Sequence, residues 1–349
     1  MNSRKKKSII SFATYGVVIL LFIVLTLMIN NKSISRTLKG QLIPICSWIV
    51  MAVSLNLVVG ISGELSLGHA GFMGIGAFSG IIVSGWLLNG FEMMDQTLRL
   101  FLAILGGGLV AGIFGVLIGI PVLRLRGDYL AIVTLAFGEI IKNVMNCVYV
   151  SVNGRNLTWG FLDGNLPGTL LLNGPMGAVK VEKISTFTAG FLLVMFTLFV
   201  VQNLINSRSG RAIMAARDNR IAAEATGINI TKYKMMAFVT AAVLAGMAGA
   251  LYGLSMATLL PTKFSFNESI NVLVFVVLGG IGNIPGSIVS AAALTILPEK
   301  LRFLQNYRML AYAILLILVM LLSNNPLVKA MWRKIFAGKR AGDGEEMRA

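Results

Sequence analysis

Charged side chains are scarce in this sequence, and their scarcity excludes most classes of soluble protein. Only 13% of the 349 residues are Asp, Glu, Lys or Arg, whereas a soluble domain has roughly 25%. Hydrophobic residues make up 56%, and the mean hydropathy is +0.82. One helical crossing of a membrane needs about 20 mainly apolar residues. Because the sequence holds many such stretches, it predicts a polytopic membrane protein without a separate soluble domain.

Histidine and cysteine are also rare, which argues against metal-dependent catalysis. The sequence has one histidine, His69, and two cysteines, Cys46 and Cys147, and none stands at a metal-ligand spacing. Catalytic zinc sites need three protein ligands. The neighbouring pair Glu64 and His69 is therefore interpreted as a hydrogen-bonding group in a glycine-rich turn. The cysteines lie in or beside apolar runs, where buried cysteine behaves as a small hydrophobic residue.

No built-in source of energy is visible in the sequence. The phosphate-binding pattern GxxxxGK[ST] is missing, so we expect that the chain does not hydrolyse nucleotide itself. A ladder of intramembrane Asp, Glu or Arg, which proton-coupled transporters and voltage sensors need, is missing too. If the protein moves a solute uphill, the energy must arrive from a partner.

The hydrophobic pattern predicts an all-α bundle of about eight full spans and one broken helix pair, about ten helical segments in all. The full spans are expected near residues 9–29, 41–60, 65–88, 99–120, 129–149, 187–206, 235–258 and 309–322. Gly76 and Gly80, like Gly108 and Gly112, are small residues four apart. That spacing lets membrane helices approach closely.

The run at residues 269–297 does not fit a simple span. Its centre reads Gly279-Gly280-Ile281-Gly282-Asn283-Ile284-Pro285-Gly286, and glycine and proline at that density interrupt a helix. Broken helices occur at membrane depth only inside protein or along a cavity. We expect two short helices that return to the starting side, with a tight packing corner as the alternative. The candidates for the pathway or a subunit contact are Gly279, Gly280, Asn283 and Pro285.

The net charge of +16 is interpreted as a topology signal rather than a nucleic-acid surface, because the basic residues lie at span ends. Lys and Arg are retained on the cytoplasmic side of a membrane. This places both termini, the loop at 124–126 and the segment 207–234 inside. The expected organisation is an N-terminal tail and span at residues 1–40, a transmembrane domain at 41–325 and a basic cytoplasmic tail at 326–349.

Residues 207–234 form a long charged segment between two apolar runs. Its basic residues are Arg208, Arg211, Arg217, Arg220, Lys232 and Lys234, set against Asp218 and Glu224. The runs 212–216 and 221–225 favour helix, and Gly227 stands where a helix end favours glycine. A basic and partly apolar helix between spans predicts contact with a soluble partner. The alternative is a topology anchor in a stand-alone channel or facilitator.

Glu139 and Lys142 lie inside the predicted span 129–149, three residues apart. This spacing puts them on one helix face, where they can neutralise each other. A lone charge at the bilayer centre costs about 2.5–3.5 kcal/mol, so neither side chain should face lipid. A role in the pathway or at a subunit contact, and a structural ion pair, both remain open. Glu64 and His69 are candidates for the same pathway or contact role.

Four stretches, in order, resemble the branched-chain amino-acid permease family of ABC importers, over about residues 42–325. The first joins residues 54–60 (SLNLVVG) to residues 63–72 (GELSLGHAGF). The second, residues 126–140 (RGDYLAIVTLAFGEI), looks like the LivM-type rather than the LivH-type member. The third runs from residue 209 to residue 251 and is similar to the family's ATPase-contacting loop and the following helix. The last is the glycine-rich break at residues 279–286.

The resemblance implies a non-catalytic, multi-pass permease subunit with a type II importer-like fold in a bacterial cytoplasmic membrane. It implies a LivH-like partner permease, two cytoplasmic ATPases and an extracytoplasmic binding protein, with no cofactor and no nucleic acid. Leucine, isoleucine and valine are the implied substrates, and urea, short amides or nucleosides are the alternatives. The implied ATPase-coupling residues are Gly210, Arg211, Arg217, Asp218, Arg220, Glu224 and Gly227.

The chain departs from the family pattern in two places. Arg220 stands where the family commonly has an acidic residue, so the charge of the ATPase contact differs here. The outer loop 151–183 has no clear match in the family, which leaves the substrate open.

Overall fold

The structure of the chain is a computed structural model. It describes residues 3–30, 36–91, 95–123, 129–162, 166–301, 307, 310–314, 316–317 and 321. The chain forms two compact units, residues 1–292 and 293–349. The predicted loop at 124–126 and the basic tail at 326–349 lie outside the described residues. The predicted span 309–322 is described only at 310–314, 316–317 and 321.

Within the described residues, six helices are long and apolar enough to cross a membrane. They are α2 (Arg36–Asn56) with its continuation η1 (Leu57–Ser62), α3 (His69–Phe91), α4 (Gln96–Val122), α5 (Tyr129–Cys147), α6 (Phe187–Asn206) and α9 (Ile230–Gly253). The ends of each helix lie within about five residues of the ends of a predicted span. The chain is therefore a mostly helical, multi-pass membrane protein. The predicted total of eight full spans is not confirmed among the described residues. The described apolar part of α1 (Ser3–Asn30) covers only Val18–Ile29, and the predicted span 309–322 is described only in part.

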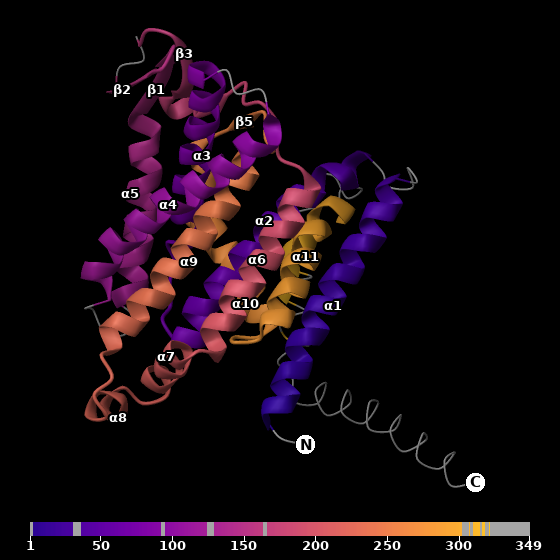
Figure 1. Ribbon diagram of the computed structural model, residues 1–349, viewed down its shortest axis with the longest axis vertical. Helices are drawn as coiled ribbons and strands as arrows, with labels where there is room; N and C mark the ends of the chain where they lie inside the picture. The colour runs from indigo at the N-terminus through magenta and orange to yellow at the C-terminus, as the bar shows by residue number, and fades with distance from the viewer. Residues whose placement is uncertain are drawn as a thin grey trace. The chain divides into compact units, whose positions relative to one another are not determined.

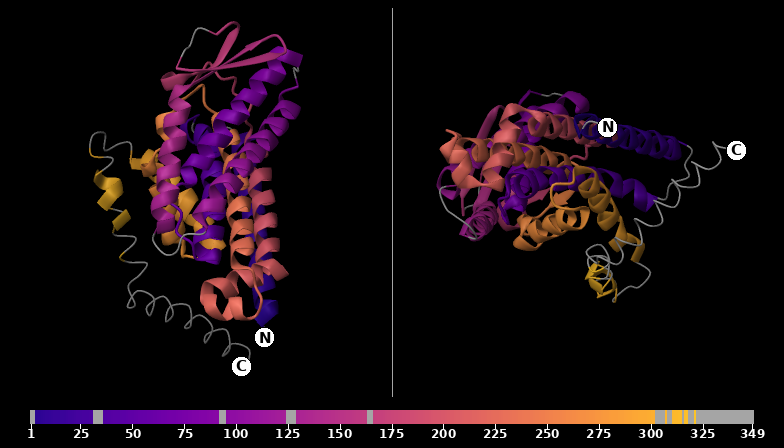
Figure 2. Two further views of the ribbon diagram at one scale, coloured as in Figure 1. Left: turned by 90° about the vertical axis from the view of Figure 1, so that its left-hand side faces the viewer. Right: turned by 90° about the horizontal axis from the view of Figure 1, so that it is seen from below.

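The core of the first unit is the packing of α3, α4 and α9, which lie side by side in Figures 1 and 2. Glycine permits this approach. A Cβ atom at Gly76 would collide with the backbone of Gly246 on α9, and one at Gly246 would collide with Ala111 on α4. The small residues therefore let the helix backbones touch, as their spacing predicts.

A small sheet follows α5 and corrects the all-α prediction. Strands β1 (Val148–Asn153), β2 (Asn156–Phe161) and β3 (Thr169–Asn173) form an antiparallel sheet in the order β2-β1-β3, visible at the upper end of Figure 1. Strand β4 (Ala178–Val179) pairs with β5 (Thr258–Leu259). Val150 and Val152 are buried on β1, and Gly154 at φ +59° helps to form the hairpin turn. From the sequence, residues 151–183 are expected to form an outer loop, and these strands are not predicted.

The predicted helix break is present. Helix α10 (Phe266–Gly279) follows the short turn η3 (Pro261–Phe264), and α11 begins at Ile284 and ends at Lys300. Between them, Gly280 and Gly282 adopt φ values of +92° and +81°, which favour glycine. With 14 residues, α10 is shorter than the about 20 residues of a full crossing. The return of α11 to the starting side stays a prediction.

The close packing of α3 on α9 predicts that Gly76→Val unfolds the protein at lower temperature. The added atoms have no space beside Gly246, and overpacking costs about 1–3 kcal/mol or more. The melting temperature in detergent should fall by several degrees, measured by loss of the monodisperse peak in size-exclusion chromatography. Gly40→Val is the matched control, because no atom lies within 4 Å of a Cβ placed at Gly40. Equal melting temperatures for the two variants would contradict the packing argument.

Candidate functional site

Two short helices occupy the charged segment between α6 and α9. They are α7 (Arg208–Asp218) and α8 (Arg220–Ala225), so the helix predicted around 212–216 and 221–225 is confirmed. Each begins at a side-chain cap: Ser207 Oγ accepts from Gly210 N at 3.0 Å, and Asn219 Oδ1 accepts from Ala222 N at 3.1 Å. Gly227, at φ +81°, follows the end of α8 as predicted.

One face of this helix pair is buried. Ile213 is fully buried on α7, while Ala216 and Ala223 form a small apolar cluster with Ile230 of α9. Gly210 contributes through its lack of a side chain, since a Cβ there would collide with carbonyl oxygens at the end of α6. The two helices are therefore folded against the membrane domain and do not form a free loop.

Arg217 points toward that domain. Its Nη1 donates to Gly60 O in η1 at 2.7 Å, while Nε and Nη2 donate to Asp218 Oδ1 at 3.0 and 2.9 Å. Its aliphatic stem occupies the space that a side chain at Gly63 would need. Among the predicted coupling residues, Arg217 thus holds α7 to η1, and Asp218 pairs with the guanidinium of Arg217.

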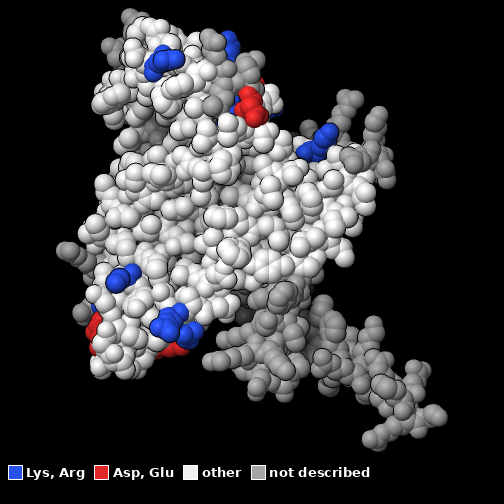
Figure 3. Space-filling view, in the orientation of Figure 1, with Lys and Arg blue, Asp and Glu red and all other residues white. Residues whose placement is uncertain are grey.

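The opposite face of the helix pair is open. Ile221 is 80% exposed, and Arg220 pairs with Glu224 at 3.1 Å with both side chains partly exposed. Arg211 donates to the carbonyl of Asn206 at 3.1 Å. In Figure 3 the end that carries α7 and α8 shows basic and acidic groups, whereas the described surface beside the spans is almost uncharged. This face combines an exposed apolar side chain with charges of both signs.

Glu64 and His69 have separate partners. Glu64 forms an ion pair with Lys234 at the start of α9, and both side chains are largely buried. His69, buried at the start of α3, shares a hydrogen bond of 2.8 Å between its Nε2 and Ser54 Oγ on α2. These contacts tie the turn between η1 and α3 to α9 and α2. They give both residues a structural role and do not bring them together as an acid–base pair.

Glu139 and Lys142 form the ion pair that their spacing predicts. The other carboxylate oxygen, Oε1, accepts from the backbone N–H of Phe266 at 3.1 Å. Phe266 is the first residue of α10, so the carboxylate satisfies an N–H group that the helix leaves unpaired and lies at its positive end. The pair therefore joins α5 to α10.

The residues of the helix break are held mainly by backbone contacts. A Cβ at Gly279 would collide with Gly286 and Ser287, and Asn283 Nδ2 donates to Gly279 O at 3.3 Å. Pro285 lies in the first turn of α11, where proline loses no hydrogen bond.

Sequence reasoning missed Asn56, which bonds to this break. Its Oδ1 accepts from Gly282 N, and its Nδ2 donates to Ser287 Oγ, each at 2.8 Å. The signal was an amide near the end of a strongly apolar run.

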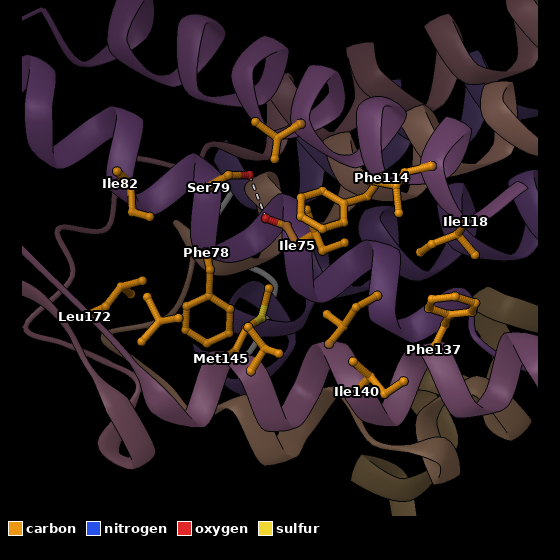
Figure 4. A pocket seen from close by; sticks show the side chains of 15 residues that line it. Ile75, Phe78, Ser79, Ile82, Phe114, Ile118, Phe137, Ile140, Met145 and Leu172 are labelled. Carbon is orange, nitrogen blue, oxygen red and sulfur yellow. Dashed lines mark hydrogen bonds between the residues drawn. The ribbon is translucent and has the colours of Figure 1, made fainter. Parts of the chain in front are cut away.

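A cavity of about 390 Å³ lies between α3, α4 and α5. Figure 4 shows its walls of aliphatic and aromatic side chains, which include Ile75, Phe78, Phe114 and Phe137. The hydroxyl of Ser79 donates to Ile75 O at 2.6 Å and is therefore already paired. The described lining offers nothing to bind the ammonium and carboxylate groups of an amino acid.

Comparison with known proteins now gives the family. The profile described as "Branched-chain amino acid transport system / permease component" matches residues 37–323. The chain belongs to this family. Its members are transport components, and the match covers every membrane helix described above except α1. No solved structure matches the chain.

Several curated relatives are similar over part of their length. The high-affinity branched-chain amino acid transport system permease protein LivM of Salmonella typhimurium is 35% identical over 246 residues, 65% of this chain and 54% of the relative. LivM of Escherichia coli is 33% identical over the same shares. The nucleoside ABC transporter permease protein NupC of Lactococcus lactis is 27% identical over 197 residues, 54% of this chain and 58% of the relative. The chain thus spans about half the length of these relatives.

The contact of Glu139 with α10 predicts that replacing Glu139 destabilises the protein, and that the loss depends on whether Lys142 keeps its charge. Glu139→Ala leaves the Phe266 N–H and the Lys142 charge without this acceptor, which costs about 1–3 kcal/mol. The melting temperature in detergent should fall. The double variant Glu139→Gln with Lys142→Met should recover most of the loss, because Gln still accepts from Phe266 and no charge is left alone. A double variant as unstable as Glu139→Ala would show that the pair does not act in this way.

Proposed function

We propose that this chain is the membrane-spanning permease subunit of an ATP-binding-cassette importer for leucine, isoleucine and valine. The observation that carries the proposal is the family match over residues 37–323, together with the helix pair α7–α8 and its open outer face. The chain performs no catalysis of its own. ATP hydrolysis by partner subunits supplies the energy, and it enters through residues 207–234.

The proposal assigns a side of the membrane to each end of the first unit. The end with α7 and α8 is cytoplasmic, as the concentration of Lys and Arg in residues 207–234 favours. Both termini are on that side too, and the sheet β1–β3 is extracytoplasmic. The membrane is the bacterial cytoplasmic membrane. A LivH-like permease completes a heterodimer, and two ATPases and a substrate-binding protein complete the importer.

Residues at membrane depth are proposed to line the pathway or to meet the second permease. On α5 these are Glu139 and Lys142, whose side chains are 32% and 19% exposed in the isolated chain. The helix break contributes Gly279, Gly280, Asn283 and Pro285. Glu64 and His69 belong to the supporting contacts beside it, because their polar groups are engaged with Lys234 and Ser54.

The substrate is the part of the proposal that needs a direct test. We expect ATP-dependent uptake of leucine, isoleucine or valine by vesicles that contain the reconstituted importer. The relatives include a nucleoside permease and an L-arabinose permease, so nucleosides and arabinose, with urea and short amides, are the competitors to add. Uptake of one of these in place of the amino acids would reassign the substrate. Solute flux through the chain without ATPases would favour a channel or facilitator.

The exposed face of α8 predicts how the ATPases bind. Ile221→Glu puts a charge at the centre of the proposed contact, and the amount of ATPase that copurifies should fall by more than tenfold, since buried apolar side chains often dominate an interface. Leu162→Glu is the matched control, because Leu162 is 79% exposed and lies beyond β2 at the other end. Retention of the ATPases by the Ile221 variant would overturn the proposed contact.

A further inference from the structure

One glycine contacts both the coupling helices and the helix break. The carbonyl oxygen of Gly60 in η1 accepts from Arg217 on α7 at 2.7 Å. On its other side, a Cβ at Gly60 would lie 2.7 Å from the Cα of Gly282 and would collide with the amide of Asn56. The backbone of Gly60 therefore lies between the Arg217 side chain of α7 and the break at residues 280–283.

Asn56 fastens the break to the same region. The residue is fully buried at the end of α2, and both ends of its amide bond to the broken segment. The acceptor receives the Gly282 N–H, and the donor reaches Ser287 in the first turn of α11. Gly282 has a positive φ, which glycine adopts readily, and in this conformation its N–H donates to Asn56 Oδ1.

The segment between these contacts is a π-helix. Leu57–Ser62 is wholly buried and ends at Gly63, whose φ is +75°. A π-helix is rare and inserts an extra residue into the helical turn, and such distortions occur frequently at functional sites. Asn56 holds the start of η1 to the break, while Arg217 and the Glu64–Lys234 pair hold its end to α7 and α9.

We propose that η1 transmits movement of α7 to the break between α10 and α11, with Arg217, Gly60 and Asn56 as positioning residues. A displacement of α7 pulls on the Gly60 carbonyl, and the contact of Gly60 with Gly282 passes the displacement to the break. The inference rests on the proposed function, because it presupposes that ATPases move α7. It adds that the helix break receives this movement.

The test separates transport from ATP hydrolysis in the assembled importer. Arg217→Ala and Gly60→Ala are each reconstituted with the partner subunits, and leucine uptake and ATP hydrolysis are measured on the same vesicles. We expect the ATPases to copurify and to hydrolyse ATP, while the uptake per ATP falls by about fivefold or more, the usual size of coupling between sites. Gly40→Ala is the control on α2, since a Cβ there meets nothing within 4 Å.

If Gly60→Ala fails to fold, Arg217→Ala is the deciding variant. Arg217 is partly exposed, and the atoms nearest to a Cβ placed at Gly60 belong to Asn56 and Gly282 rather than to Arg217. An unchanged ratio of uptake to hydrolysis in Arg217→Ala overturns the proposal. Loss of ATPase copurification in this variant also overturns it, since the inner contact would then be part of the ATPase interface. Failure of the proposed function has a different signature, which is the absence of ATP-dependent leucine uptake by vesicles that hold the unaltered chain with its partner subunits.

Discussion

Close approach of helix backbones is the constraint on which the rest of the structure depends. Lipid supplies no hydrophobic force that would bring apolar helices together, so contact between them has to come from fit. At Gly76 and Gly246 the backbones of α3 and α9 are so close that no side-chain atom fits between them. The same kind of contact occurs between Gly60 and Gly282, where it brings η1 against the helix break. The protein therefore uses one kind of contact both to build its core and to hold its break.

Charges near the spans form ion pairs, and each of these pairs contacts a second element. Glu64 with Lys234 joins the turn after η1 to α9, and Glu139 with Lys142 reaches the start of α10. A third pair, which the sequence did not suggest, joins the buried Arg99 of α4 to Glu182 at 2.5 Å. Because a buried charge without a partner is expensive, each pair also specifies which elements lie together. The few charged residues near the spans therefore help to determine which elements pack against each other.

Sequence patterns predicted the regular parts of this fold well. Helix α6 covers the residues expected for its span, and the glycine-rich break lies where composition placed it. The two helices of the charged segment were also foreseen, because helix formers and capping residues act locally. These features depend on neighbours in the chain, which a single sequence displays directly.

The features that escaped prediction depend on distant residues or on weak alternation. Asn56 and Gly282 are 226 positions apart, and nothing near either residue indicates the other. The direction of Arg217, inward to Gly60 rather than outward like Ile221, follows from how α7 docks and not from its sequence. The sheet β1–β3 was missed because residues 151–183 were treated as an outer loop, and the pairing of its strands is set by contacts between separate segments. Pairing over long separations is set by packing, which composition does not encode.

The meeting of two helix ends at residues 280–283 has a consequence for the local electric field. Helix α10 brings its carbonyl end there, and α11 brings its N–H end. The partial charges of the two ends have opposite sign and largely cancel. A neutral group that can donate and accept at once suits such a place, and the amide of Asn56 has both capacities. An aspartate would lose the donor to Ser287 and bring an unbalanced charge, so the identity of this side chain follows from the polarity of the helices around it.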